Sequence, residues 1–126
     1  EQESFEACCD LVRQRPDVTA ILAASGVLFV AALRALKACK RAFPGDVSIV
    51  GIDDFPLASL MTPTVTVVAQ PVKRIGKVAF ELLLRRMETT DAPTIHRMLE
   101  PSLIVRGSCR QAGDSTQQGE KSGKRR

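Results

Sequence analysis

The feature that most constrains the fold of this chain is a short β-branched run near its middle. Residues 47–52 are apolar except for Ser48 and Gly51, with a Pro-Gly-Asp turn sequence before them and two aspartates after them. An apolar run of this length between turn signals is typical of a strand that is buried on both faces. We therefore expect a parallel sheet that is covered on both sides.

Asp53 and Asp54 come directly after this predicted strand. In open α/β sheets, ligands bind in the crevice beyond the carboxyl ends of the strands. A carboxylate pair at that edge can hold a ligand hydroxyl or a cation. An aspartate that follows a strand also often caps the next turn, so each of the two has a structural alternative.

Helices and strands alternate along the chain. The pattern of apolar residues predicts a helix over residues 4–15, a strand over 19–24 and a helix over 27–42 before the central strand. The elements expected after it are a short turn or helix at 55–61, a strand at 64–69, a helix at 72–88, and strands at 94–98 and 102–106. This alternation predicts an α/β fold with a parallel sheet in a three-layer sandwich.

The predicted helix at residues 27–42 has no face suited to water in its first half. Residues 27–33 are seven consecutive apolar residues, whereas lysines and arginines crowd the last two turns. A helix that is apolar all round is buried on two sides. One side faces its own sheet, and the other is covered either by another part of the chain or by a second subunit.

Composition and charge limit the kinds of function. The chain has 126 residues, which is enough for one domain, and its content of 44% apolar and 25% charged residues is that of an ordinary globular protein. The net charge is +4, but the segment after Arg106 contributes +3 through five basic and two acidic residues. The part before it is therefore nearly neutral, which is poor support for a nucleic-acid-binding face. We expect a folded domain at residues 1–106 and a disordered basic tail at 107–126.

The cysteines and the single histidine give no sign of a metal site. Cys8, Cys9, Cys39 and Cys109 show no Cys-x-x-Cys spacing, and His96 is the only histidine. A zinc site needs about four tetrahedral ligands, so neither a metal nor a cofactor is expected. Free thiols suit a reducing compartment, and no apolar run approaches the ~20 residues that span a membrane. A cytoplasmic protein without membrane contact is the expectation.

The motifs around the central strand resemble one family. In order, the chain carries Pro44-Gly-Asp-Val-Ser-Ile-Val-Gly-Ile-Asp-Asp54, Leu57-Ala-Ser-Leu60, Thr62-Pro63, Thr66-Val67 and Gln70-Pro71. This set resembles the effector-sensing core of lactose-repressor-type (LacI/GalR) transcriptional regulators, over about residues 5–108. The resemblance implies the type I periplasmic-binding-protein fold, with this chain as the C-terminal portion of the sensor domain.

The resemblance also implies a ligand site for a small-molecule effector such as a sugar or related polyol. Asp53 matches the acidic residue that hydrogen-bonds effector hydroxyls. Gln70, where the chain passes beside the ligand cleft, is a weaker candidate. Ser25 and Gly26 stand where the family usually has Asn-Asp. A serine at the ligand-bordering position keeps one hydroxyl but lacks the two-sided amide, which alters recognition there. Asp54 is expected to stabilise the turn.

By the same resemblance, two apolar segments pair across a homodimer interface. The residues expected there are Val27, Val30, Leu33, Arg34, Leu57, Leu60 and Met61. The helix at 72–88 and the strand after it are expected to cross into the other lobe of a two-lobed receptor. The chain opens on Glu1 and its first methionine is Met61, so we expect a fragment or an incomplete reading frame. DNA binding is then expected only through an N-terminal helix-turn-helix that this chain lacks.

Two other functions fit parts of the sequence. A solute-binding protein of an ABC-type sugar transporter shares the fold, and a secretion signal in place of a helix-turn-helix would distinguish it. A phosphoacceptor or magnesium enzyme built on Asp53 and Asp54 needs further carboxylates and a lysine, but the neighbouring strand ends carry Ser25 and Gln70. A lone His96 allows no Ser-His-Asp set. The expected function is therefore effector sensing and dimerisation, without enzyme activity.

Overall fold

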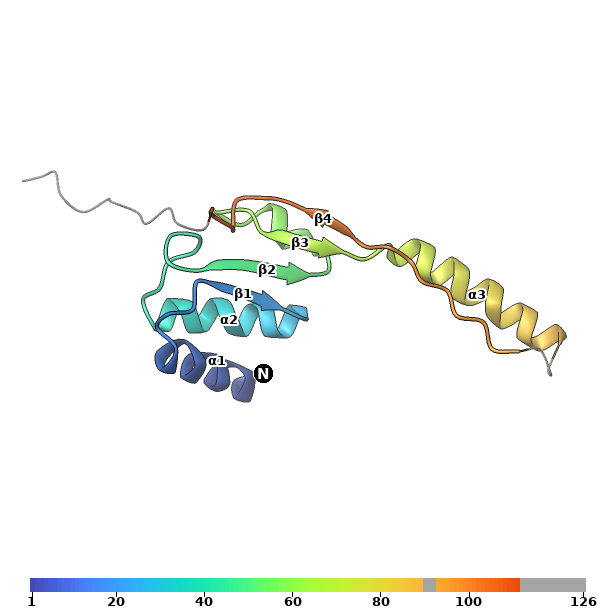
Figure 1. Cartoon of the computed structure of the whole chain (residues 1–126), viewed down its shortest axis with the longest axis horizontal. Helices are drawn as coiled ribbons and strands as arrows, with labels where there is room; N and C mark the ends of the chain where they lie inside the picture. The colour runs from blue at the N-terminus through green and yellow to red at the C-terminus, as the bar shows by residue number, and fades with distance from the viewer. Residues whose placement is uncertain (90–92, 112–126) are drawn as a thin grey trace, which may run out of the picture.

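A computed structural model describes residues 1–89 and 93–111 of the chain. The elements are α1 (Gln2–Gln14), β1 (Ala20–Ala23), α2 (Gly26–Ala38), β2 (Ser48–Ile52), the 3-10 helix η1 (Pro56–Ser59), β3 (Thr66–Ala69), α3 (Val72–Glu88) and β4 (Ser102–Ile104). The four strands form one sheet in the order β1-β2-β3-β4. Helices α1 and α2 lie together near β1, whereas α3 extends away from the sheet (Figure 1).

The sheet is mixed. Strands β1, β2 and β3 run parallel, whereas β4 pairs with β3 in the antiparallel direction. The predicted α/β fold class is confirmed, with its last strand reversed. Residues 94–98 form no strand, contrary to expectation, because they return beside α3 and away from the sheet, where no described strand pairs with them (Figure 1).

One face of the sheet carries the core. Ile49 of β2 and Val67 of β3 are fully buried in the same cluster as Phe29 and Leu36 of α2, and Val12 brings α1 into it. The seven-residue apolar run in α2 therefore divides between this core and an exposed side. The buried residues of the run face the core, and its exposed residues lie on the side that the described residues leave uncovered.

Two aromatic rings pack over the middle of the sheet at Gly51. This glycine follows Ile49 by two residues, so it lies on the same face of β2. A methyl group built on Gly51 would meet Phe29 at 3.4 Å and Phe55 at 3.7 Å. The two ring centroids are 5.2 Å apart in a tilted arrangement. The distances of 3.4 and 3.7 Å are ordinary van der Waals distances, so the two rings lie directly over the backbone of β2 at Gly51.

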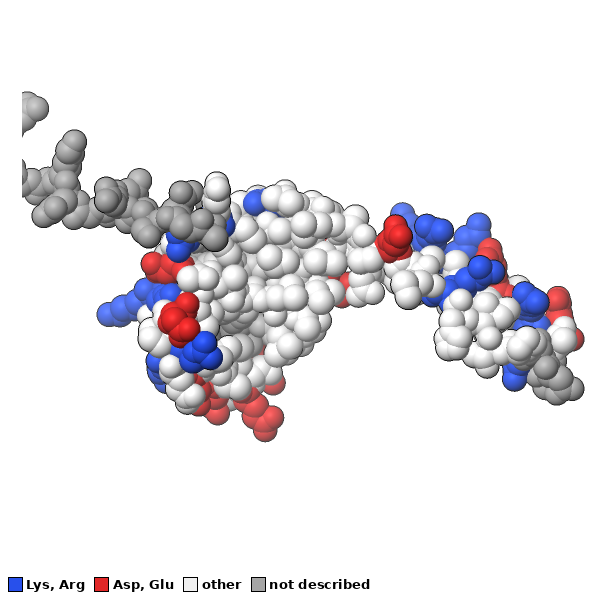
Figure 2. Space-filling model, in the orientation of Figure 1, with Lys and Arg blue, Asp and Glu red and all other residues white. Residues whose placement is uncertain are grey.

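The opposite face of the sheet is open in the part of the chain that the structure describes. In β2 only Ile49 and Gly51 are buried, and the residues that alternate with them are half-buried. Leu22 of β1 and Leu103 of β4 are 64% and 63% exposed. Figure 2 shows a broad area without charged side chains over the sheet. The prediction that the central strand is buried on both faces is wrong here, because the described helices cover one face only.

Helix α2 ends at Ala38, four residues before its predicted end. Lys40 adopts a left-handed backbone conformation with φ 55°. Its N–H donates to the carbonyl of Lys37 at 3.1 Å, and the N–H of Arg41 donates to the carbonyl of Leu36 at 2.8 Å. This pair of bonds is the Schellman termination of a helix. The left-handed position is usually glycine, so a lysine there carries no visible stop signal.

Helix α3 has the predicted bounds. None of its residues is buried. Leu83 is 56% exposed, and Phe80 is 60% exposed. Lys77 and Glu81 form an exposed ion pair at 3.9 Å, at i,i+4 spacing. The chain that returns at 93–95 lines a hollow together with apolar side chains of α3.

Residues 107–110 belong to the folded part and not to a tail. Ser108 is fully buried, and its hydroxyl oxygen accepts the N–H of Thr66 at 2.9 Å while the hydroxyl donates to the carbonyl of Ile49. The carbonyl of Ser108 also accepts the N–H of Ile49 at 2.9 Å. The predicted domain boundary after Arg106 is therefore too early, because a polar segment here joins β2 to β3. Residues 112–126 of the predicted tail lie outside the described residues.

Candidate functional site

The strand register brings the three predicted ligand residues to one edge of the sheet. The last paired residues of β1 and β2 are Ala23 and Gly51, and Ser25 and Asp53 each stand two residues beyond that pair. Gln70 directly follows β3 at the same edge. Because the three strands are parallel, this is the carboxyl edge at which α/β sheets bind ligands.

Asp53 has an unusual backbone conformation. Its φ of 74° lies in the left-handed region, which costs roughly 1–2 kcal/mol for a residue with a Cβ and is best tolerated by Asp and Asn. Its N–H donates to the carbonyl of Val68 at 2.9 Å, which adds one bond to the β2–β3 pairing. Strained residues of this kind concentrate at functional sites. The chain therefore leaves the sheet at Asp53 with the carboxylate exposed.

Gln70 is in direct contact with Asp53. Its Nε2 donates to Oδ1 of the carboxylate at 2.8 Å. An ionised carboxylate has about four acceptor sites, so one amide donor fixes its direction and leaves room for others. Both side chains are exposed in the described part of the chain. The pair can accept a hydroxyl donor on Asp53 while Gln70 holds the carboxylate in place.

Ser25 has a structural role at the same edge. It is the N-cap of α2, and its Oγ accepts the N–H of Leu28 at 3.3 Å. This bond satisfies one of the free N–H groups at the start of the helix. The hydroxyl hydrogen remains able to donate to a ligand. Ser25 therefore combines a capping function with a half-buried position beside the candidate site.

Asp54 has a different partner from Asp53. The guanidinium of Arg106 donates to its two carboxylate oxygens at 2.9 and 3.0 Å. These hydrogen bonds lower the pKa of the Asp54 carboxyl below its ordinary value and raise the pKa of Arg106, with desolvation opposing both shifts. A structural role for Asp54 was expected, but its partner was not, since no sequence spacing links positions 54 and 106.

The two aspartates do not converge on a shared ligand position, because each is held by its own partner. Within residues 1–89 and 93–111, no group of three or more His, Cys, Asp or Glu is placed to hold a metal ion. His96 is exposed in the chain that returns beside α3, and it does not lie in a strand. Burial raises the pKa of the Cys8 and Cys9 thiols. None of the helices in the described residues is long and apolar enough to cross a membrane.

The predicted dimer residues divide into three groups. The exposed apolar ones are Val27, Val30, Leu57 and Leu60. Leu33 and Met61 are partly buried at the margin of the core. The guanidinium of Arg34 lies 4.7 Å from the centroid of the Phe5 ring and 3.9 Å from a carboxylate oxygen of Glu1, so α1 already engages it.

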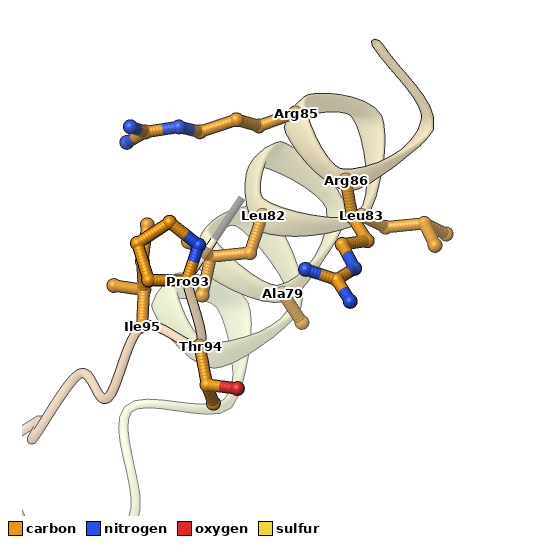
Figure 3. A pocket seen from close by; sticks show the side chains of 8 residues that line it. All are labelled: Ala79, Leu82, Leu83, Arg85, Arg86, Pro93, Thr94 and Ile95. Atoms are coloured by element: carbon orange, nitrogen blue, oxygen red, sulfur yellow. The ribbon is translucent and has the colours of Figure 1, made fainter. Parts of the chain in front are cut away.

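A hollow of about 410 Å³ lies along α3, outside the candidate site. Leu82, Pro93 and Ile95 contribute apolar walls, and the arginines of the last turn reach out beside it (Figure 3). Because α3 packs against no other described element, this hollow is the space between a helix and the chain that returns beside it. It is not adjacent to Asp53, Ser25 or Gln70.

Comparisons with known proteins agree with this arrangement. A family profile described as a periplasmic binding protein-like domain matches residues 1–109. The chain is 39% identical over 92 residues to the HTH-type transcriptional regulator MalR of Streptomyces coelicolor, which covers 73% of this chain and 27% of that protein. It is 38% identical over 99 residues to CelR of Thermobifida fusca, which covers 79% of this chain and 29% of that protein.

Solved structures give the same likeness. A complex of the transcriptional regulator CelR with cellobiose matches 83% of this chain and 32% of its own, with a TM-score of 0.75 and 37% identity. A LacI family regulator of Arthrobacter sp. FB24 in complex with lactose matches 85% of this chain and 41% of its own, with a TM-score of 0.71 and 27% identity. The chain therefore spans about a third of the length of such proteins.

Proposed function

We propose that this chain, which belongs to the periplasmic binding protein-like domain family and to its LacI-type branch, is part of the effector-sensing and dimerisation module of a transcriptional regulator. The observation that carries the proposal is the strained Asp53, whose exposed carboxylate is held by Gln70 at the carboxyl edge of the sheet. Such a carboxylate is suited to accept hydrogen bonds from the hydroxyls of a neutral ligand.

The proposed ligand is a sugar or a related polyol. Cellobiose and lactose are bound in the similar regulators named above, which supports this class of ligand for Asp53. In this scheme Gln70 orients Asp53, and Ser25 donates its free hydroxyl hydrogen. Because Ser25 also caps α2, a ligand at this position is in contact with the start of the helix that carries Val27 and Val30.

Dimerisation is the second part of the proposal. Val27 and Val30 on α2 and Leu57 and Leu60 around η1 are exposed apolar residues of the sheet part of the molecule. A second copy that covers them would remove this surface from water, at about 25 cal/mol per Å² of apolar area. DNA binding is assigned to a helix-turn-helix elsewhere in the cytoplasmic regulator, and we assign no catalysis to this chain.

The experiment is a calorimetric titration of a full-length regulator that carries this chain, with cellobiose, lactose and ribose as the probes. Asp53→Asn removes the charged acceptor, which is worth about 1.5–3 kcal/mol, so affinity for the bound sugar should fall by roughly one to two orders of magnitude. Operator binding without sugar should change little.

Asp46→Asn is the matched control. Asp46 lies at the opposite end of β2, where its carboxylate accepts the N–H of Ala42 at 2.7 Å. This variant loses the same charge from the same strand without touching the candidate site, so its sugar affinity should remain that of the unmodified protein. Equal sugar affinities for Asp53→Asn and the unmodified protein would remove Asp53 from the site.

A further inference from the structure

Arg106 holds together both ends of the segment that links β2 to β3. Its guanidinium donates to both carboxylate oxygens of Asp54, and its Nη1 also donates to the carbonyl of Val65 at 2.9 Å. Asp54 and Val65 delimit residues 54–65, which follow Asp53 in that segment and which we call the crossover. The side chain of Arg106 is only 17% exposed, so these bonds are partly shielded from water.

The crossover has other anchors between its two ends: Phe55 and Met61 pack against the core, and Oγ1 of Thr64 accepts the N–H of Gly107 at 3.3 Å. Its single regular element is η1, and only Ala58 within it is fully buried before the chain reaches Val65. The backbone N–H of Val65 donates to the carbonyl of Ala58 at 2.7 Å. The crossover also carries the exposed Leu57 and Leu60. A guanidinium that ties its two ends therefore fixes the position of this apolar surface as well.

Asp53 stands directly before this anchor. On its own side of the turn, the Asp53 N–H is bonded to Val68 and its carboxylate to Gln70. A left-handed aspartate persists only where its surroundings hold it there. The next residue, Asp54, is the one that Arg106 binds through both oxygens. The strained turn is thus held on both sides. Gln70, where the chain starts toward α3, binds Asp53, and Arg106, where the chain returns from α3, binds Asp54.

From this geometry we infer that Arg106 is a positioning residue. From the returning chain it holds Asp54, and thereby the Asp53 turn and η1, in place, while Gln70 directs the Asp53 carboxylate. The inference rests on the proposed function, because it concerns the same ligand site. Arg106 follows the segment that comes back along α3 (Figure 1), and it precedes Ser108, whose buried hydroxyl joins β2 to β3. A displacement of that segment moves Asp54, and with it both Asp53 and the surface of Leu57 and Leu60.

The test uses hydrogen exchange, measured by mass spectrometry, on the full-length regulator that carries this chain. Arg106→Lys keeps the charge but loses the planar fork that spans Asp54 and Val65. Exchange in peptides that cover residues 53–61 should become about tenfold faster, whereas exchange in peptides that cover residues 19–24 should stay unchanged. Affinity for cellobiose, the probe sugar, should fall about tenfold in the same variant.

Arg41→Lys is the matched control, because Arg41 also donates to two backbone carbonyls, those of Pro16 and Val18, away from the crossover. This variant should leave exchange at residues 53–61 unchanged. The double variant Asp54→Asn with Arg106→Lys should exchange no faster at residues 53–61 than Arg106→Lys alone, since both changes break one unit.

Three results would overturn the inference. They are unchanged exchange at residues 53–61 in Arg106→Lys, equally faster exchange across the whole sheet, and local faster exchange with undiminished cellobiose affinity. If the unmodified protein binds none of cellobiose, lactose and ribose, the proposed ligand class fails by itself. A local change in exchange would then still uphold Arg106 as the residue that positions the Asp53 turn.

Discussion

Helices α2 and α3 differ in what covers them, although both carry several large apolar side chains. Five residues of the 13-residue α2 are buried, against none of the 17 in α3. The sheet body, which we define as residues 1–69 and 102–110, packs α1, β1 and β2 against α2. The α3 arm, which consists of α3 and residues 93–101, extends alone (Figure 1). The pattern of apolar residues therefore predicts where a helix forms, but the contacts of the helix with other elements decide how much its apolar residues contribute to stability.

The largest expected effect compares one phenylalanine from each region. Phe29 is 1% exposed in the sheet body, and Phe80 is 60% exposed in the α3 arm. Phe29→Ala should lower the free energy of unfolding of this chain by about 3–5 kcal/mol, because it leaves a cavity in the core. Phe80→Ala should cost less than about 1 kcal/mol. Chemical denaturation of both variants measures the difference, and equal losses would mean that α3 packs against the body in solution.

The next prediction compares exposed leucines of the two regions. Leu60 in the crossover is 75% exposed and Leu83 in α3 is 56% exposed. In a full-length regulator that carries this chain, Leu60→Lys should place a charge in the dimer interface and weaken dimerisation by about 3 kcal/mol, roughly a hundredfold. Leu83→Lys should leave dimerisation unchanged, since the proposed interface does not include α3. Sedimentation at micromolar concentration distinguishes the two, and a dimeric Leu60→Lys protein would contradict the interface.

A smaller effect is expected at Ser108, whose buried hydroxyl joins β2 to β3 in the sheet body. Ser108→Ala leaves the N–H of Thr66 and the carbonyl of Ile49 without their buried side-chain partner. An unsatisfied buried polar group costs about 1–3 kcal/mol, so the free energy of unfolding should fall by about 2 kcal/mol. Ser102→Ala, at an exposed position of β4, is the control and should change it by less than about 0.5 kcal/mol. Thermal denaturation that does not separate these variants would place Ser108 outside the core in solution.

Much of the fold could be predicted from the sequence, because its signals are local. The alternation of helices and strands, the bounds of α3 and the resemblance to LacI-type regulators were all present in apolar spacing and ordered motifs, and the resemblance is confirmed. The end of α2 was missed because Lys40 occupies the left-handed position that glycine usually marks. The prediction of a strand at residues 94–98 was wrong, because a segment with a strand-like pattern forms a strand only where it pairs with another strand.

The site shows the same limit. Asp53 and Gln70 were predicted as separate candidates, and their contact at 2.8 Å follows from the parallel register of β2 and β3. The roles of these residues as ligand contacts stay a prediction. Arg106 and Ser108 were not identified, because their partners Asp54 and Ile49 lie more than 50 residues away along the chain. Only the three-dimensional return of the chain from the α3 arm brings them together.

The smallest expected effect is an acid response of the sheet body through Asp54. Its pKa in the folded chain is lowered by hydrogen bonds from Arg106, so the unfolded chain takes up a proton first as the pH falls. The stabilisation is fully present above the ordinary aspartate pKa of about 3.9 and is lost as the pH falls through the lower folded value.

The denaturation midpoint should therefore fall as the pH drops below about 4, by less than the effect of Ser108→Ala, because the Asp54 side chain is 36% exposed and salt screens the pair. Asp17, whose pKa is lowered by its exposed hydrogen bonds to Arg15, contributes in the same direction, so Asp17→Asn is the matched control. Asp54→Asn should remove more of the acid response than Asp17→Asn, since Asp54 joins two distant parts of the sheet body. If the two variants respond to acid alike, the pair of Asp54 with Arg106 does not contribute to the difference between the body and the α3 arm.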